Sequence, residues 1–201
     1  MNCEKALKFI DQNKDSLLKD LQTLIHQPSI SAKNEGIKEC SVLVSKMLKK
    51  SGIKSEILRL GKNAAPLVYG EVKSKNNPNT TLLFYNHYDV QPVEPLELWD
   101  DPPFSGKIIG NKIFGRGASD DKGELITRIK AVESYLKTYG DVPCNVKFVI
   151  EGEEENGSEN IGTYLKKYKK KFSCDGVVWE FGYVDQKNRP IIGLGMKGLL
   201  Y

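Results

Sequence analysis

Hydrophobic residues recur at helical spacing over the first quarter of the chain. The first apolar series predicts a helix that ends before Pro28, because proline cannot continue a helix. Its members are Leu7, Ile10, Leu17, Leu21, Leu24 and Ile25. A second helix is predicted from about Gly36 to Gly52, where glycine is a natural stop. Residues 55–60 and 67–72, separated by a Gly-Lys-Asn turn, predict two strands.

Three short and almost continuous apolar runs follow, each typical of a strand that is buried on both faces. They are residues 81–85, 146–150 and 176–179, and helical patterns over about 122–139 and 160–170 separate them. Strands that alternate with helices in this way favour an α/β fold. We expect a three-layer sandwich, with helices on both faces of a mixed, largely parallel central sheet.

Composition narrows the class of protein. Hydrophobic residues make up 39% of the 201 residues and charged residues 28%, with a net charge of +4, as is ordinary for a globular protein. The lysine-rich residues 166–171 lack an aromatic platform and are expected to be a solvated helix end. The sequence shows neither an apolar signal core nor a run of membrane-spanning length. We therefore expect a cytoplasmic protein that binds neither nucleic acid nor membrane.

Cysteine usage agrees with that compartment. Four cysteines are scattered without the spacing of a metal or redox motif. Free thiols are the expectation, because disulfides are rare in a reducing compartment. The residues concerned are Cys3, Cys40, Cys144 and Cys174.

Polar residues follow each predicted buried strand at the point where it stops. His87 and Asp89 come after the first strand, the acidic residues 151–158 after the second, and Glu180 after the third. In open α/β sheets, ligands bind outside the carboxyl ends of the strands, so these side chains should converge on one crevice. The glycine-rich residues 115–123, which open the helix after the first strand, contribute further carboxylates.

This set of side chains predicts a metal site. Imidazole nitrogen and carboxylate oxygens without a thiolate suit zinc, cobalt or manganese better than copper or an iron–sulfur cluster. Several acids crowded together repel one another unless cations neutralise them. A single carboxylate from Asp120 could bridge two ions, which two-metal hydrolases hold about 3.5–4 Å apart.

Each feature also has a structural explanation when taken alone. His87 could be a hydrogen-bonded structural histidine, and the glutamates at 153–155 could be a solvated turn. The loop 115–123 could be a phosphate-binding turn, although its paired aspartates would repel phosphate and it lacks the ending of a P-loop. The joint occurrence at strand ends favours the metal site.

Four segments in this order closely resemble the di-zinc metallopeptidase family. That family includes carnosinase-like cytosolic dipeptidases, acetylornithine deacetylase, succinyl-diaminopimelate desuccinylase and aminoacylase. The resemblance runs from about residue 21 to the C-terminus, and the first two segments are most similar to the dipeptidase branch. The segments are residues 86–92 (Asn-His-Tyr-Asp-Val-Gln-Pro), 99–104 (Trp-Asp-Asp-Pro-Pro-Phe), 115–123 (Gly-Arg-Gly-Ala-Ser-Asp-Asp-Lys-Gly) and 151–158 (Glu-Gly-Glu-Glu-Glu-Asn-Gly-Ser).

The resemblance implies zinc-dependent hydrolysis of an amide bond in dipeptides or small peptides. Removal of an acyl group from N-acyl amino acids is the alternative within the same family. The complete enzyme would hold two Zn²⁺, with Co²⁺ or Mn²⁺ as substitutes. His87 and Glu180 would bind the first metal, Glu155 the second, and Asp120 would bridge both.

The resemblance also assigns the catalytic roles. Glu154 matches the general base, which takes a proton from the attacking water and returns it to the leaving amine. Asp89 matches the carboxylate that orients His87. Glu153 makes the alignment of the acidic run with the family motif ambiguous. The motif Glu-Glu-x-Gly-Ser favours Glu154 as the base and Glu155 as the ligand.

One ligand of the family has no counterpart here. The second metal of the family needs a histidine from the far C-terminal part of the catalytic domain, but this chain has only His87 and His26. The inserted lid domain would follow residues 195–198. We therefore expect residues 1–201 to be the N-terminal portion of the catalytic domain, without the lid and the C-terminal part, and a homodimer is implied for the full-length form. Hydrolysis by this chain alone should be weak or absent.

A hypothesis of a different class remains open. The chain could be a non-catalytic, metal-binding half that pairs with a separate C-terminal part. The absent histidine motivates this alternative, and it predicts metal binding without hydrolysis.

Overall fold

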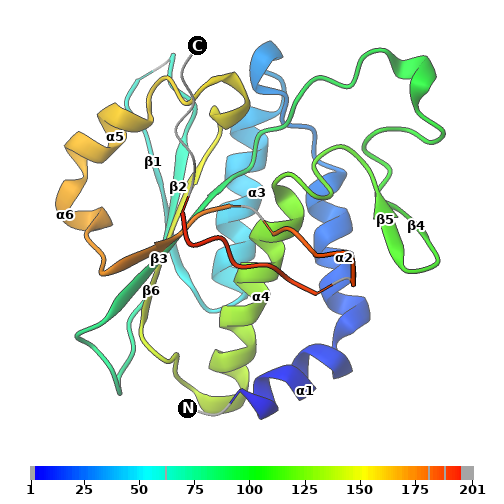
Figure 1. Cartoon of the computed structure of the whole chain (residues 1–201). Coiled ribbons are helices and arrows are strands. Elements are labelled where there is room, and N and C mark those ends of the chain that lie inside the picture. The colour runs from blue at the N-terminus through cyan, green and yellow to red at the C-terminus, as the bar shows by residue number, and fades with distance from the viewer. Residues whose placement is uncertain (1–2, 62, 181, 188, 196–201) are drawn as a thin grey trace.

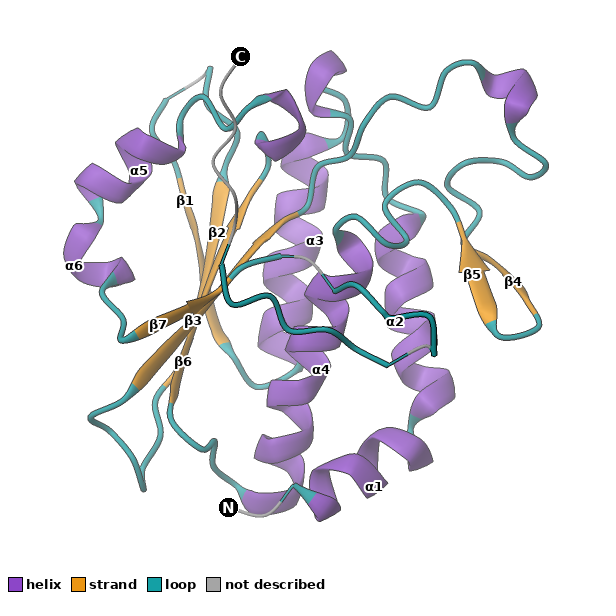
Figure 2. Cartoon of the chain, viewed as in Figure 1, coloured by secondary structure: helices purple, strands orange, loops and turns teal. Residues whose placement is uncertain are grey.

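A computed structural model describes residues 3–61, 63–180, 182–187 and 189–195. The helices and strands appear in Figures 1 and 2. The helices are α1 (Glu4–Gln12), α2 (Lys14–Ile25), α3 (Ile37–Lys50), α4 (Lys122–Tyr139), α5 (Ile161–Lys167) and α6 (Lys169–Phe172). The strands are β1 (Lys54–Leu58), β2 (Leu67–Val72), β3 (Thr81–His87), β4 (Lys107–Ile109), β5 (Lys112–Phe114), β6 (Asn145–Glu151) and β7 (Gly176–Val178). Short 3₁₀ turns lie at Ser31–Lys33, Leu96–Leu98 and Glu154–Asn156.

The main sheet has the strand order β1-β2-β6-β3-β7. Strand β3 pairs in parallel with both β6 and β7, whereas β2 pairs antiparallel with β1 and β6. The sheet is therefore mixed, as the sequence predicted. Strands β3, β6 and β7 run in the same direction and form the parallel half of the sheet. Candidate residues lie at or just after the carboxyl ends of these three strands.

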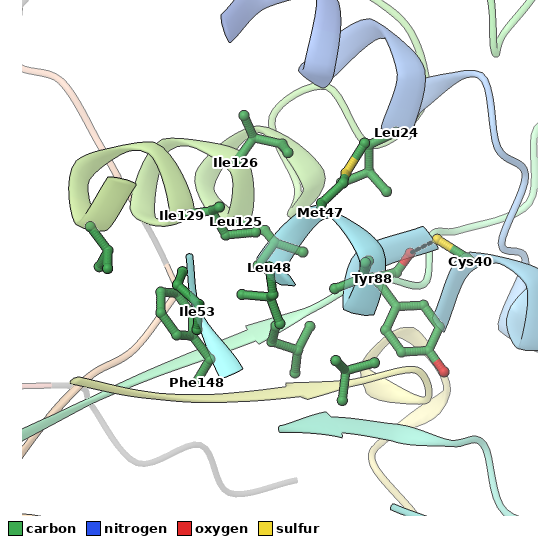
Figure 3. Packing of buried hydrophobic residues seen from close by; sticks show 14 of the residues in the cluster. Leu24, Cys40, Met47, Leu48, Ile53, Tyr88, Leu125, Ile126, Ile129 and Phe148 are labelled. Atoms are coloured by element: carbon green, nitrogen blue, oxygen red, sulfur yellow. Dashed lines mark hydrogen bonds between the residues drawn. The ribbon is translucent and has the colours of Figure 1, made fainter. Parts of the chain in front are cut away.

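Alternating side chains of the central strand β6 separate two cores. Phe148 and Ile150 pack with residues of α2, α3 and α4, whereas Val149 packs with Tyr164 of α5 and Phe172 of α6. Figure 3 shows the first core, in which side chains of all three helices and Phe148 belong to one cluster. Figure 1 shows α5 and α6 on one side of the sheet and α2–α4 on the other. The predicted three-layer arrangement is confirmed.

The first predicted helix is wrong in one respect, because the structure divides it into α1 and α2. At the junction, the backbone N–H of Asn13 bonds to the carbonyl oxygens of both Phe9 and Ile10, and its side chain donates to the Phe9 oxygen at 2.8 Å. An asparagine that bonds to nearby backbone competes with the helical pattern. As a result α1 turns toward the end of α4, where the Lys5 N–H lies 3.4 Å from the Tyr139 hydroxyl.

The helix predicted over 160–170 is likewise two shorter helices, α5 and α6, which meet at Tyr168. The lysines at 166, 167, 169 and 170 are exposed, in agreement with a solvated helix end. The hairpin of β4 and β5, which projects beside α2 in Figure 1, was not predicted. All four cysteines are free thiols. Among the helices described, none is both long and apolar enough to cross a membrane.

Candidate metal centre

His87 is the last residue of β3, and its side chain is fully buried. Its Nε2 atom lies 2.9 Å from Asp120 Oδ1, 3.4 Å from Glu180 Oε2 and 3.9 Å from Glu154 Oε2. These carboxylates come from the turn before α4, the segment after β7 and the turn after β6. The structure thus brings together side chains that are far apart in the sequence, at the crevice that the strand ends predicted.

The other ring nitrogen of His87 faces Asp89. Nδ1 lies 3.1 Å from the Asp89 carbonyl oxygen and 3.4 Å from its Oδ1. The Asp89 carboxylate also accepts the backbone N–H groups of Glu154 and Glu155, at 3.2 and 3.0 Å. Asp89 therefore orients the imidazole and fixes the start of the acidic turn. Nε2 faces Asp120 Oδ1 at hydrogen-bond distance and donates to it when the ring carries both protons, whereas a bound cation would take the place of the Nε2 proton while Nδ1–H still donates to Asp89.

Two carboxylate oxygens at this site are buried and have no hydrogen-bond partner. They are Oδ1 of Asp121 and Oε2 of Glu180, whose residues are 1% and 8% exposed. One ligand atom each from His87, Asp121 and Glu180 lie within 4.8 Å of one another. Burying a carboxylate oxygen without a partner is costly, and a cation removes that cost. The residues therefore fit a divalent cation with nitrogen and oxygen ligands.

The pKa values of these side chains also indicate that the buried carboxylates need a positive charge beside them. Burial raises the pKa of Glu180 to about 8 and that of Asp121 to about 7. Burial opposes a charge on His87, but hydrogen bonds to Asp120 and Asp89 raise its pKa to about 12. A proton on the imidazole thus occupies the position where a cation would neutralise the carboxylates.

Asp121 was not among the ligands predicted from the sequence. Its second oxygen, Oδ2, accepts hydrogen bonds from Asn86 Nδ2 at 2.7 Å and from the His87 N–H at 2.9 Å. It thereby ties the start of α4 to the end of β3. The Asp-Asp pair was visible in the sequence, but the direction of each carboxylate depends on the fold of the loop.

The three neighbouring glutamates of the acidic turn point in different directions. Glu153 accepts hydrogen bonds from the Ala65 N–H at 2.5 Å and from Asn160 Nδ2 at 3.0 Å, away from His87. Glu155 accepts from Gln91 Nε2 at 2.8 Å and is not part of the group formed by His87, Asp121 and Glu180. Glu154 is thus the member of the run that the structure places beside His87.

The second histidine lies elsewhere. His26 follows α2, and its Nε2 bonds to the Ser105 carbonyl oxygen at 2.8 Å. A cavity of about 280 Å³ opens next to the site, and its lining includes Asp120, Asp121, Glu180 and Tyr183. Carboxylates therefore line this cavity, and the buried His87 contacts two of them, Asp120 and Glu180.

A mixed sheet with a histidine and unsatisfied carboxylates at its strand ends defines a metal-binding α/β protein. Residues 83–193 match Peptidase family M20/M25/M40, and the chain belongs to this family. The family and the fold predicted from the sequence are confirmed.

The curated relatives include dipeptidases and a deacylase. The Cys-Gly metallodipeptidase dug1 of Schizosaccharomyces pombe is 32% identical over 100% of this chain and 45% of that protein. The Beta-Ala-His dipeptidase of Homo sapiens is 27% identical over 98% of this chain and 42% of that protein. The succinyl-diaminopimelate desuccinylase of Blochmanniella pennsylvanica is 33% identical over 74% of this chain and 38% of that protein. The chain thus spans less than half the length of these relatives.

Solved structures show the same fold. The M20 family metallo-carboxypeptidase Sso-CP2 from Sulfolobus solfataricus is 40% identical with a TM-score of 0.80, over 86% of this chain and 39% of that chain. Human carnosine dipeptidase 1 is 27% identical with a TM-score of 0.81, over 89% of this chain and 41% of that chain. The metal-dependent hydrolases in this set agree with the chemistry of the cluster around His87.

Proposed function

We propose that this chain forms a metal site and the general base of a metal-dependent dipeptidase. The observation that carries the proposal is the convergence of Asp120, Glu180 and Glu154 on Nε2 of the buried His87. The oxygens Glu180 Oε2 and Asp121 Oδ1 support it, because they are buried without a hydrogen-bond partner and a bound cation would remove the cost of burying them.

The proposed ligands follow from this geometry and from the family resemblance. His87 and Glu180 would hold the first metal, and Asp120 would contribute to both sites. Glu155 is proposed as a ligand of the second metal from the resemblance alone, since its carboxylate here accepts from Gln91. Zn²⁺ is the proposed ion, since the nitrogen and carboxylate donors suit it. When bound, the metal polarises the scissile carbonyl and lowers the pKa of an attacking water.

Glu154 is the proposed general base. Its carboxylate is half-buried, and burial together with the neighbouring Glu155, Asp89 and Asp120 raises its pKa above the ordinary value. A raised pKa suits a group that must accept and release a proton near neutral pH. Glu154 takes a proton from the attacking water and delivers it to the leaving amine, while Asp89 holds its backbone N–H in place.

The metal site is tested by zinc calorimetry on the metal-stripped chain. The wild type should show a saturable tight site, and His87→Ala should lose it. His26→Ala is the matched control, because His26 bonds to Ser105 and should keep the wild-type affinity. Equal zinc binding by wild type and His87→Ala would contradict the proposed site.

The reaction is tested by a substrate panel on the zinc-loaded chain. We expect weak hydrolysis, faster with dipeptides than with N-acyl amino acids. Glu154→Gln should lower any measured rate by about 10²–10⁴-fold. Glu153→Gln is the matched control, since Glu153 bonds to Ala65 and Asn160 instead.

The same panel separates the alternatives. Deacylation is the second candidate because a desuccinylase is 33% identical to this chain. Faster release of acetyl or succinyl groups than of amino acids would favour it. Tight zinc binding without any hydrolysis would favour a metal-binding half that works with a separate part.

A further inference from the structure

Glu151 is a buried carboxylate that lies beside the metal centre without belonging to it. It is the last residue of β6, is 4% exposed, and pairs in parallel register with His87 of β3. Its Oε1 accepts hydrogen bonds from the Tyr85 hydroxyl and, at 2.9 Å, from Ser158 Oγ. We call the trio of Glu151, Tyr85 and Ser158 the Glu151 clasp.

One donor of the clasp belongs to the acidic turn. Ser158 closes this turn, because its backbone N–H bonds to the Glu153 carbonyl oxygen at 2.8 Å. The turn that carries Glu154 is therefore held at both ends by the same residue: it starts from the backbone of Glu151 and returns to the Glu151 carboxylate.

The other donor leads to Glu180. The Tyr85 ring stacks on Trp179, with 3.9 Å between ring centroids and 23° between planes. The Trp179 indole N–H in turn lies 3.3 Å from Glu180 Oε1, the oxygen that does not face His87. Tyr85 thus links the Glu151 carboxylate to the segment that presents Glu180.

We propose that Glu151 is a positioning residue that fixes Glu154 and Glu180 relative to each other around His87. This inference rests on the proposed metal site. The physical reason is that one buried oxygen accepts two hydroxyl donors. If the acidic turn or the Trp179 segment shifts, a donor leaves and the buried carboxylate loses a partner, which costs more than the bond itself gains.

A second buried carboxylate shows what a purely structural role looks like. Asp141 is 5% exposed and accepts hydrogen bonds from Ser74, Lys75 and Asn76, all in one turn. Its loss should destabilise that turn without reaching the metal centre. Glu151 differs because its two donors lie in different segments, each leading to a group that faces His87.

The expected effect is moderate, because Arg128 of α4 provides a parallel link. It donates to the carbonyl oxygens of Tyr85 at 2.7 Å and Trp179 at 2.6 Å. Loss of the clasp should therefore displace Glu180 only partly.

The test is a cobalt titration of the metal-stripped chain, followed by the visible absorption of bound Co²⁺. Glu151→Leu and Tyr85→Phe should each weaken Co²⁺ binding about 10-fold, as substitutions behind metal ligands do, and should change the absorption spectrum. Glu151→Gln should keep the wild-type spectrum and stay within about twofold of the wild-type affinity, because its amide oxygen still accepts both hydroxyls. In the Glu151→Leu background, Tyr85→Phe should add no further loss.

Two matched controls separate positioning from general destabilisation. Tyr164→Phe removes another buried tyrosine hydroxyl on the same side of the sheet, one that bonds to the Ala65 oxygen at 2.9 Å. Asp141→Asn perturbs the other buried carboxylate. Both should lower stability in urea and leave Co²⁺ affinity and the spectrum unchanged.

Wild-type affinity and spectrum in Tyr85→Phe and in Ser158→Ala would overturn the proposal. These two variants also decide the matter if Glu151→Leu fails to fold, since each removes one donor and keeps the carboxylate. A wild-type chain that binds no Co²⁺ would overturn the metal site and the clasp together. Binding that is lost in His87→Ala but unaffected by the clasp variants would overturn the clasp alone.

Discussion

Two clusters of carboxylates among the described residues differ in their basic partners, since one contains two lysines and the other a single histidine. Between α2, α3 and α4, Asp20 bonds to Lys130 Nζ at 2.5 Å and to Lys50 Nζ at 2.8 Å, and Lys130 also bonds to Glu133 at 2.7 Å. We call these four residues the lysine cluster. At the metal centre, Oδ1 of Asp121 and Oε2 of Glu180 have no hydrogen-bond partner.

The two clusters differ in how the fold shifts the pKa of their acids. Burial acts to raise the pKa of Asp20, but hydrogen bonds to Lys130 and Lys50 bring it below its ordinary value. Burial raises the pKa of Asp121 to about 7 and that of Glu180 to about 8. The comparison teaches that a buried acid paired with lysines is part of the scaffold, whereas one with unsatisfied oxygens points to a cation from outside the chain.

The largest effect is expected from removing the internal cation of the lysine cluster. Lys130→Met removes the cation from one oxygen of the buried Asp20 and leaves Glu133 with the Ser51 hydroxyl as its donor, at 3.0 Å. It should lower the free energy of unfolding by about 3 kcal/mol, the lower end for a broken buried pair because Lys50 remains. Urea unfolding measures the change, and zinc affinity should stay at the wild-type value. A loss of zinc affinity would show that the two clusters are coupled.

The next largest effect is expected from adding a cation to the metal centre. Zinc at about 100 times its dissociation constant should raise the free energy of unfolding by about 2.7 kcal/mol. His87→Ala should abolish this increment, whereas Lys130→Met should retain it. Urea unfolding with zinc and with chelator measures both. An equal increment in His87→Ala would place the bound zinc elsewhere.

A pH experiment sharpens the comparison further. Because the pKa of Asp20 is lower in the folded than in the unfolded state, its ionised form stabilises the fold. This stabilisation is fully present above the unfolded pKa of about 3.9 and is lost as the pH falls through the folded pKa. Asp20→Asn should therefore be less stable than wild type near neutral pH, by a difference that shrinks in acid. A difference independent of pH would contradict the ion pair.

The smallest effect is expected at an exposed ion pair. Lys107 bonds to Asp101 at 2.7 Å, with side-chain exposures of 50% and 26%. Lys107→Ala should change the free energy of unfolding by less than about 1 kcal/mol, because solvent screens the pair. Zinc affinity should not change. A loss as large as that of Lys130→Met would mean that exposure does not separate these pairs.

Some elements were predictable because their signals are local. The helix expected over 122–139 has those bounds as α4, and Gly140 ends it in the left-handed conformation, with φ of 67°. Leu125 and Ile129 of its apolar series are fully buried. The break between α1 and α2 was not predictable from spacing, because the apolar period continues past Asn13. It depends on how the Asn13 side chain bonds to Phe9.

At the site, the sequence predicted which segments meet but not how every side chain points. His87, Asp120 and Glu180 meet as expected, because strand ends position His87 and Glu180 and the turn before α4 positions Asp120. The direction of Glu153 depends on the N–H of Ala65, which lies in a distant loop. The unsatisfied oxygen of Asp121 likewise depends on the fold of its loop. The roles assigned to all of these residues stay predictions until metal binding is measured.

The position of β6 has a consequence for synthesis on the ribosome. It is the sixth strand to be made, yet it lies in the middle of the sheet between β2 and β3. Until residues 145–151 emerge, β2 and β3 each present an unpaired edge, and such edges attract other chains. A translational pause before β6 emerges should therefore increase the demand for chaperones, whereas a pause after it has paired should not.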